Sequence, residues 1–203
     1  KFNGNGHKIT NLYINRSDED NIGLFGYIGS GGEVHDLGIE GCVITGSWGV
    51  GVIVGVNAGS ISGCYGTGSV SGTRDVGGLV GMNSGGVENS YNICTVSGSK
   101  YTGGIVGRNS ESGSVLDCYS IGYVLGEYFV GGLIGYNQSG TVENSYWDVG
   151  SSGITLSDGG IGKSTVEMKR QATYLGWDFT NVWKIVENES YPYLSWQSQA
   201  LEV

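Results

Sequence analysis

One short phrase returns five times along this chain, and it constrains the fold more than any other feature. It reads Gly-Leu-Phe-Gly at residues 23–26, and later copies end at Gly55, Gly81, Gly107 and Gly135. The closing glycines follow one another at intervals of 29, 26, 26 and 28 residues. An internal period of that length is typical of solenoids, propellers and repeat arrays, in which each unit packs mainly on its neighbours.

The composition of each unit favours a β-solenoid over the other repeat architectures. Every unit holds short runs rich in β-branched residues, separated by Gly, Asn and Ser, which is the pattern of strands and turns. A propeller blade needs roughly 40 residues or more, so about 26 residues is too short for one. The 40 glycines suit corners and close coil contacts, and the single proline suits strands that all donate hydrogen bonds. We therefore predict an all-β parallel solenoid with coils of about 26–28 residues over residues 1–162, the first of them a partial coil at 1–22.

Two polar positions repeat with the same period and predict structural ladders. Equivalent residues of stacked coils form rows with a spacing of about 4.8 Å. An asparagine row, expected to bond the turn backbone and its own members, contains Asn57, Asn83, Asn109 and Asn137. A tyrosine row contains Tyr65, Tyr91, Tyr119 and Tyr146, with Tyr13 as an earlier member. Stacked rings would fix the register of the coils, and the alternative use of such a row is a platform for sugar rings.

A second region, residues 163–203, differs in composition. Of the 40 glycines, only Gly176 follows residue 162, whereas three of the five tryptophans lie there. Ser164 and Glu167 have the spacing of a capping box, which predicts a short amphipathic helix at 165–175 that Gly176 can end. Strand-like pieces follow at 182–186 and 193–196. Because a solenoid end exposes unpaired strand edges, we expect this small α+β segment to cap the rod.

The phrase Gly-Leu-Val-Gly-x-Asn, followed by Gly-Val-Glu-Asn-Ser-Tyr at 86–91, resembles the GLUG-motif repeat proteins. The opening residues 2–14 are similar to the segment that leads into such repeats, and residues 168–196 to the segment that follows them. The resemblance implies a right-handed parallel β-helix on large secreted or surface-anchored bacterial or archaeal proteins. Some of these are adhesin-like, and some are proteases that carry the repeats as an accessory region. The motif has no agreed catalytic residues, so the resemblance assigns no site.

Candidate catalytic and metal-binding groups are few and poorly placed. Glycoside hydrolysis needs two carboxyls roughly 5 to 10 Å apart, but Glu88 and Glu143 are separated by the coil of Leu116, and Asp36 and Asp117 by still more. The acidic run 18–20 lacks the spacing of a known calcium loop. Residues 162–164 resemble only the end of a phosphate loop, and His7 and His35 have no ligand-spaced partner. We predict no catalytic residue, metal or cofactor.

The four cysteines occupy two columns of the repeat. Cys64 and Cys118 have Ser90 between them, and Cys42 and Cys94 have Gly68 between them. Residues two coils apart are about 9.6 Å apart at the strand spacing used above. A disulfide needs Cα atoms within roughly 7 Å. We therefore predict that Cys42, Cys64, Cys94 and Cys118 are all free.

The two apolar residues inside the repeated phrase raise a question of facing, because alternate residues of a strand point to opposite sides. Unless a bend turns both inward, one of two rows forms an exposed apolar stripe and a docking face. One row contains Leu24, Ile53, Leu79, Ile105 and Leu133, and the other contains Phe25, Val54, Val80, Val106 and Ile134.

These observations favour a non-enzymatic structural or adhesive module of a secreted or cell-surface protein, serving as stalk, adhesin or fibre segment. A glycan-binding module that uses the tyrosine row is one alternative, and an accessory region of a larger secreted protease or polysaccharide-active enzyme is another. The expected partners are other domains of the same polypeptide, neighbouring copies, or glycans and proteins of a host or matrix. With a net charge of −9, the chain is a poor match for nucleic acid or an anionic membrane. No apolar stretch is long enough for membrane insertion.

Overall fold

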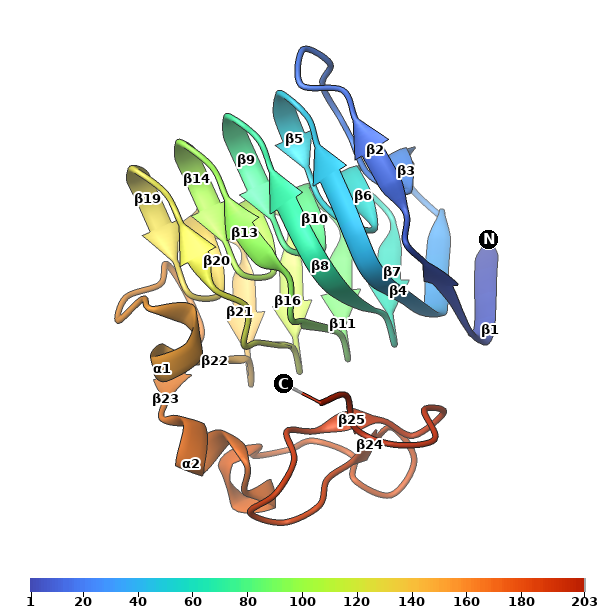
Figure 1. The fold of residues 1–203 in the computed structure, drawn as a ribbon, viewed down its shortest axis with the longest axis vertical. Coiled ribbons are helices and arrows are strands. Elements are labelled where there is room, and N and C mark those ends of the chain that lie inside the picture. The colour runs from blue at the N-terminus through green and yellow to red at the C-terminus, as the bar shows by residue number, and fades with distance from the viewer. Residues whose placement is uncertain (203) are drawn as a thin grey trace.

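The chain winds into a parallel β-solenoid, so the fold class predicted from the repeats is confirmed (Figure 1). A computed structural model describes residues 1–202, and Val203, the last residue of the predicted C-terminal segment, lies outside the described residues. The coils contribute strands to three parallel sheets, and the repeated positions pair in register apart from shifts in the two long strands at 2–10 and 33–45. Helices are few and short.

Two of the sheets take at most one strand from any coil. The five-stranded sheet contains β3 (Phe25–Ile28), β6 (Val54–Asn57), β10 (Val80–Asn83), β15 (Val106–Asn109) and β20 (Ile134–Asn137). The four-stranded sheet contains β5 (Trp48–Val50), β9 (Arg74–Gly77), β14 (Lys100–Gly103) and β19 (Tyr128–Gly131). The repeated Gly-Leu-Val-Gly phrase lies at the corner between them.

The third sheet has 14 strands because the chain crosses it more than once in each coil. Its longest members are β1 (Phe2–Thr10), β4 (Glu33–Thr45) and β8 (Tyr65–Ser71). The others are β2 (Tyr13–Asn15), β7 (Ser60–Ser62), β11 (Gly86–Glu88), β12 (Tyr91–Asn92), β13 (Thr95–Ser97), β16 (Ser114–Leu116), β17 (Tyr119–Ser120), β18 (Val124–Leu125), β21 (Thr141–Glu143), β22 (Tyr146–Asp148) and β23 (Ile161–Lys163).

The corner at the repeated phrase bends the chain so that both apolar residues point inward. Both predicted rows are buried from the second coil onward, with Leu79 and Val80 each fully buried, and only Leu24 and Phe25 are partly exposed. Of the two outcomes that the sequence left open, the inward bend is the one observed, and coils two to five carry no apolar stripe that could serve as a docking face. The glycines permit the bend, since a Cβ on Gly78 would lie 2.1 Å from the carbonyl oxygen of Gly104 on the next coil.

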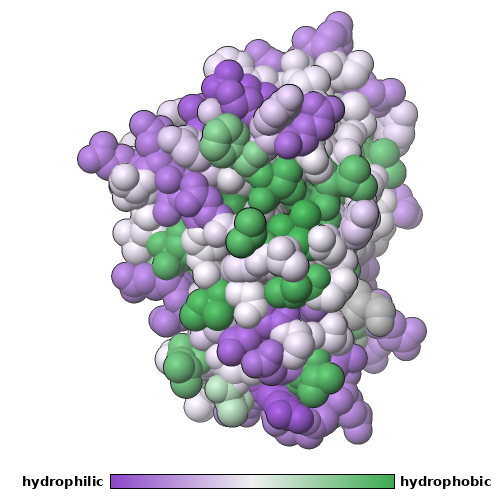
Figure 2. Space-filling view, turned by 90° about the vertical axis from the view of Figure 1, so that its left-hand side faces the viewer, coloured by the Kyte–Doolittle hydropathy of each residue, from purple (hydrophilic) through white to green (hydrophobic). Residues whose placement is uncertain are grey.

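The end of the rod is closed by a segment that the sequence did not single out. Asp148 caps α1 (Val149–Ser152), and residues 154–163 then form part of a further turn. The amide of Gly132 donates to Leu156 at 3.0 Å, and that of Ile161 donates to Ser145 at 2.9 Å. Figure 2 looks onto this end, where hydrophobic side chains gather within a polar rim; Leu156 and Ile161 are among the exposed apolar residues.

The C-terminal segment lies along the side of the rod, whereas we expected it to cap the end (Figure 1). Its helix α2 (Thr165–Met168) is shorter than predicted and is followed by a 3₁₀ turn at Gln171–Thr173. The antiparallel pair β24 (Trp183–Lys184) and β25 (Tyr193–Leu194) follows. Ser164 caps α2 in a capping box with Glu167, so the residues that resembled a phosphate loop begin this helix.

Candidate functional site

The tyrosine row is a stack of rings. Tyr65, Tyr91, Tyr119 and Tyr146 are paired in register on adjacent coils. The rings of Tyr65 and Tyr91, and those of Tyr91 and Tyr119, have centroids 5.0 Å apart and lie within 5° of parallel. Tyr146 ends the stack differently, because its ring meets Tyr174 edge-on at 5.2 Å. All four side chains are buried.

Tyr13 does not belong to this row, which corrects the predicted alignment of the first partial coil. It pairs with Val43 and is 68% exposed. Lys8 occupies the equivalent position instead, since it pairs with Gly38, which in turn pairs with Tyr65. A bulge between Asn3 and His7 shifts the register of β1. Equal spacing of apolar residues in the first coil therefore pointed to the wrong partners.

The C-terminal segment covers the tyrosine row from end to end. Trp196 stacks on Tyr65 with centroids 5.6 Å apart, and Gln197 accepts a hydrogen bond from the Tyr91 hydroxyl at 3.0 Å. The Tyr119 hydroxyl donates to the carbonyl of Pro192. Burial raises the pKa of Tyr91 and of Tyr119 far above the ordinary phenol value. The rings are thus part of a second core, which the three tail tryptophans signalled but the repeat pattern did not.

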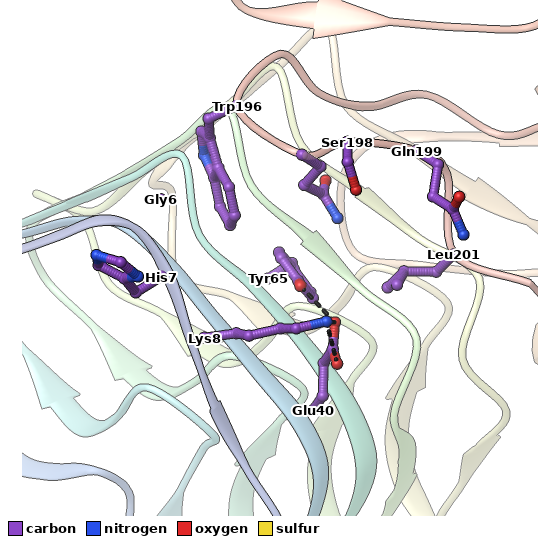
Figure 3. Close-up of a pocket in the computed structure, with 10 residues that line it drawn as sticks. Gly6, His7, Lys8, Glu40, Tyr65, Trp196, Ser198, Gln199 and Leu201 are labelled. Carbon is purple, nitrogen blue, oxygen red and sulfur yellow. Dashed lines mark hydrogen bonds and ion pairs between the residues drawn. The ribbon is translucent and has the colours of Figure 1, made fainter.

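An open cleft remains where the C-terminal segment meets the first coils (Figure 3). It has a volume of about 440 Å³. Trp196, Ser198 and Gln199 line one side, and Lys8, Glu40 and Tyr65 face them from the solenoid. His7, an exposed side chain, lies at the edge. Its remaining lining residues are Gly6, Gln197 and Leu201.

The polar groups of the cleft satisfy one another. Glu40 accepts a hydrogen bond from the Tyr65 hydroxyl at 2.7 Å and forms an ion pair with Lys8 at 2.9 Å. Burial alone raises the pKa of Glu40, but these two partners outweigh it and lower the pKa. Burial, together with the hydrogen bond to Glu40, raises the pKa of Tyr65. The pair therefore holds a fixed carboxylate beside a neutral phenol, an arrangement that can orient a small polar group.

The asparagine row ends the strands β6, β10, β15 and β20 and is internally bonded. The side-chain amide of Asn57 donates to Asn83 at 2.9 Å, Asn83 donates to Asn109 at 2.9 Å, and Asn109 donates to Asn137 at 3.0 Å. Each member also bonds its own turn; Asn57 accepts from the amide of Gly59 at 3.1 Å, for example. The side-chain amides of the row therefore bond one another and their own turns, and so hold adjacent coils together.

All four cysteines are free and buried, but the distance argument fails for one pair. The sulfur atoms of Cys42 and Cys94 are 4.0 Å apart although the residues are two coils apart. Gly68 lies between them without a side chain, so the two thiols meet across it. A hydrogen bond from Cys94 lowers the pKa of Cys42, whereas burial raises the pKa of Cys94.

The acidic residues considered in the sequence occupy three places. Glu88, Leu116 and Glu143 form one row as expected, and burial, with the charges of both glutamates, raises the pKa of Asp117 beside them. None of these three carboxylates forms an ion pair within residues 1–202. In the acidic loop at 18–20, Glu19 forms an ion pair with Arg16 at 2.9 Å. Elsewhere, in β4, the His35 side chain lies 2.9 Å from Asp36. No group of three or more metal-ligating side chains occurs in the described part of the chain.

Comparison with known proteins assigns no family to the chain. No family profile matches it. It is 44% identical over 71 residues to halomucin of Haloquadratum walsbyi, which corresponds to 35% of this chain and 1% of halomucin. It is 52% identical over 44 residues to a "Putative Gly-rich membrane protein" of Evansella cellulosilytica, over 22% of this chain and 5% of that protein. The chain thus spans only a small part of the length of either relative.

A solved structure shares the fold. It is described as a "putative immunoglobulin A1 protease" from Bacteroides ovatus, and it superposes with a TM-score of 0.74 over 98% of this chain and 78% of that chain. The sequence identity is 23%, so the likeness concerns the fold. No helix among residues 1–202 is long and apolar enough to cross a membrane.

Proposed function

We propose that this chain is a scaffold region of a larger secreted or cell-surface protein, with no catalytic activity of its own. Its work is geometric: it holds neighbouring domains apart as a stiff rod, in the manner of a stalk or a fibre segment. An adhesive role is part of the same proposal, with other domains or neighbouring copies as partners. The repeated phrase and its flanking segments support grouping the chain with the GLUG-motif repeat proteins.

The observation that carries this proposal is the use of every repeated polar row for contacts inside the molecule. Asn83 bonds the amides above and below it, and the hydroxyl of Tyr91 bonds Gln197. Groups that catalysis would need free are thereby committed to holding coils in register. The match to halomucin, and the Bacteroides ovatus structure that shares the fold, support placement on an exported or surface protein.

An accessory region of a secreted protease or polysaccharide-active enzyme is the second candidate. It is favoured by the fold shared with the structure described as a protease. Both candidates assign the same scaffold role to these residues and differ only in what the rod carries. The glycan platform on the tyrosine row is not retained, because the rings of Tyr65, Tyr91 and Tyr119 are each only 1% exposed beneath the C-terminal segment.

A hydrolysis panel tests the non-enzymatic part of the proposal. The purified chain is incubated with casein, an immunoglobulin, and a set of neutral and acidic polysaccharides, alongside Glu40→Gln and Asp117→Asn variants. We expect no product from any substrate. Product that forms with the wild-type chain and disappears with either variant would contradict the proposal, because the loss would identify a working carboxyl group in the cleft or in the acidic row.

A further inference from the structure

A cluster of aromatic and cationic side chains covers the outer corner between the four-stranded and five-stranded sheets. Successive coils place Trp48, Arg74, Lys100 and Tyr128 in one paired row. The next position in the same strands holds Gly49, Asp75, Tyr101 and Phe129. On the neighbouring sheet, Arg108 and Tyr136 are paired on adjacent coils. We call these side chains, Trp48, Arg74, Asp75, Lys100, Tyr101, Arg108, Tyr128, Phe129 and Tyr136, the corner cluster.

The backbone at this position is left-handed in four successive coils, with φ +52° at Asp75, and two of these coils place bulky residues there. Gly49 adopts a φ of +67°, which glycine tolerates, but Tyr101 and Phe129 hold the same left-handed conformation at +56° and +55°. Bulky residues are rare there, and most other residues with positive φ in residues 1–202 are Asn, Asp or Gly. Strain of this kind gathers at functional sites. The two rings therefore occupy positions where glycine would fold more easily.

The rings and cations of the cluster are interleaved. The Tyr101 ring lies 5.0 Å from Tyr136 and 5.1 Å from Phe129. The guanidinium carbon of Arg74 lies 5.2 Å from the Trp48 ring and 5.3 Å from the Tyr101 ring, and the Lys100 ammonium lies 4.8 Å from Tyr101. Such contacts fix each cation against a flat ring and leave its hydrogen-bonding edge directed away from the ring.

The charge of the cluster is opposite to that of the whole chain. It gathers three of the ten lysines and arginines in a protein of net charge −9. Asp75 is fully buried beneath them, 3.1 Å from Arg108 and 3.6 Å from Arg74. Glu127, beside Tyr128, is the other acidic residue of these strands and turns. The Nε atom of Arg74 is buried and has no hydrogen-bond partner within residues 1–202.

Flat apolar faces remain open on the same surface. Trp48 is 40% exposed, Phe129 54% and Tyr128 63%. A hollow of about 130 Å³ adjoins the cluster at Arg108 and is lined mainly by Val56, Met82 and Ser84. The paired row places Arg74 and Lys100 on adjacent coils, about 4.8 Å apart, between exposed rings at its two ends. This order suits a linear polymer that carries anionic groups on successive units and offers ring faces to either side.

We infer that the corner cluster binds an acidic polysaccharide whose units carry carboxylates, as uronic acids do. The open ring faces stack on the sugar rings, while Arg74 and Lys100 bind the carboxylates, since a guanidinium matches a carboxylate in a forked pair. A nucleic acid is a poorer match, because its affinity rests on many phosphate contacts and this surface offers three cations on an acidic chain. The inference goes beyond the scaffold role and does not depend on it.

Affinity gel electrophoresis tests this inference with the intact chain. Gels contain polygalacturonate, alginate or hyaluronate, and neutral dextran serves as the reference. We expect at least one acidic polysaccharide to retard the wild-type chain more than dextran does, and salt to weaken the retardation. The double variant R74Q/K100Q is expected to lose about tenfold or more in affinity. A double variant Y13A/R16Q removes an exposed tyrosine and arginine elsewhere and should bind as wild type.

The variant Phe129→Gly separates a binding role from a structural one. Because glycine occupies the equivalent position at Gly49, we expect an unchanged or raised Tm together with weaker retardation. A lowered Tm with unchanged retardation would overturn the inference, because the ring would then serve stability alone. The inference also fails if no acidic polysaccharide retards the chain, if R74Q/K100Q binds normally, or if single-stranded DNA or polyglutamate binds more tightly than every polysaccharide.

Discussion

Asn83 shows at the scale of one residue how the rod is held together. It is 1% exposed, accepts from Asn57 and donates to Asn109, and also donates to the carbonyl of Gly85 at 3.1 Å. A buried polar group left without a partner costs about 1–3 kcal/mol. Asn83→Ala removes these bonds and leaves partners on both neighbouring coils unsatisfied. We therefore expect it to lower the free energy of unfolding by about 3 kcal/mol or more, as measured by urea denaturation.

Asn137 provides the matched control, because it ends the row and donates only to the carbonyl of Gly140 at 2.9 Å. Asn137→Ala should cost distinctly less than Asn83→Ala. Equal losses for the two variants would mean that the row does not act as a continuous ladder.

The buried thiols give a second prediction at this scale. Each is at most 1% exposed, and burial raises the pKa of Cys64 to about 12. Since the thiolate is the reactive form, the native chain should react with a thiol reagent at pH 8 only as fast as it unfolds. After denaturation, all four thiols should react with the reagent. Rapid labelling of two or more thiols in the native chain would contradict the burial described above.

Single residues also mark where prediction from the sequence succeeded and where it failed. The period alone placed the members of the asparagine row and the stacked tyrosines, because equivalent positions of a solenoid must align. Tyr13 was misplaced because a bulge in β1 changes the register, which spacing cannot reveal. The closeness of Cys42 and Cys94 was missed because Gly68 lets side chains meet across a coil.

At the scale of an element, α2 depends on its first turn. The hydroxyl of Ser164 donates to Glu167 at 2.6 Å, and the amide of Ser164 donates to it at 2.9 Å. These hydrogen bonds lower the pKa of Glu167 to about 2 from an ordinary value of 4.5. A depressed pKa contributes stability that is complete above the unfolded value and is lost as the pH falls toward the folded one.

We therefore expect Glu167→Gln to destabilise the chain at pH 6 and to have less effect at pH 3, when free energies of unfolding are compared. The gain is modest because Glu167 is near the surface, where water weakens such interactions. Glu189→Gln, which changes an exposed carboxylate in the same segment, is the control and should show no such trend. A constant difference between Glu167→Gln and wild type across this range would refute the assignment.

The elements show a further limit of sequence reasoning. The capping box correctly marked the start of α2, but the helix ends at Met168 although the apolar spacing continued to Leu175. Met168 is buried and packs in the same core cluster as the tyrosine row, whereas Leu175 is 71% exposed. Tertiary packing therefore decided the length of the helix. The inward turn at Leu79 and Val80 was likewise left open, because strand alternation gives no sign of a bend.

At the scale of the whole molecule, the C-terminal segment decides which surface is free. Its Trp183 is fully buried between the tyrosine row and Trp177, whose ring lies 4.5 Å away. The sequence indicated a capping role for this segment, yet nothing in its composition says whether an aromatic tail covers the end or the side of a rod. The C-terminal segment covers the tyrosine row on the side of the rod, and residues 154–163 close its end. The corner cluster remains an aromatic surface that is open to a partner.

We expect the coils and the C-terminal segment to unfold as one unit, because the asparagine row bonds the coils to one another and the tyrosine row bonds them to the C-terminal segment. Native-state hydrogen exchange, read by mass spectrometry, tests this most directly. We expect the amides of β10 and β15 and those of the Trp183–Leu194 pair to exchange only through global unfolding, with a common free energy. Exchange of the C-terminal pair within seconds, while the central coils stay protected, would contradict this expectation. The tyrosine row would then be accessible to a partner.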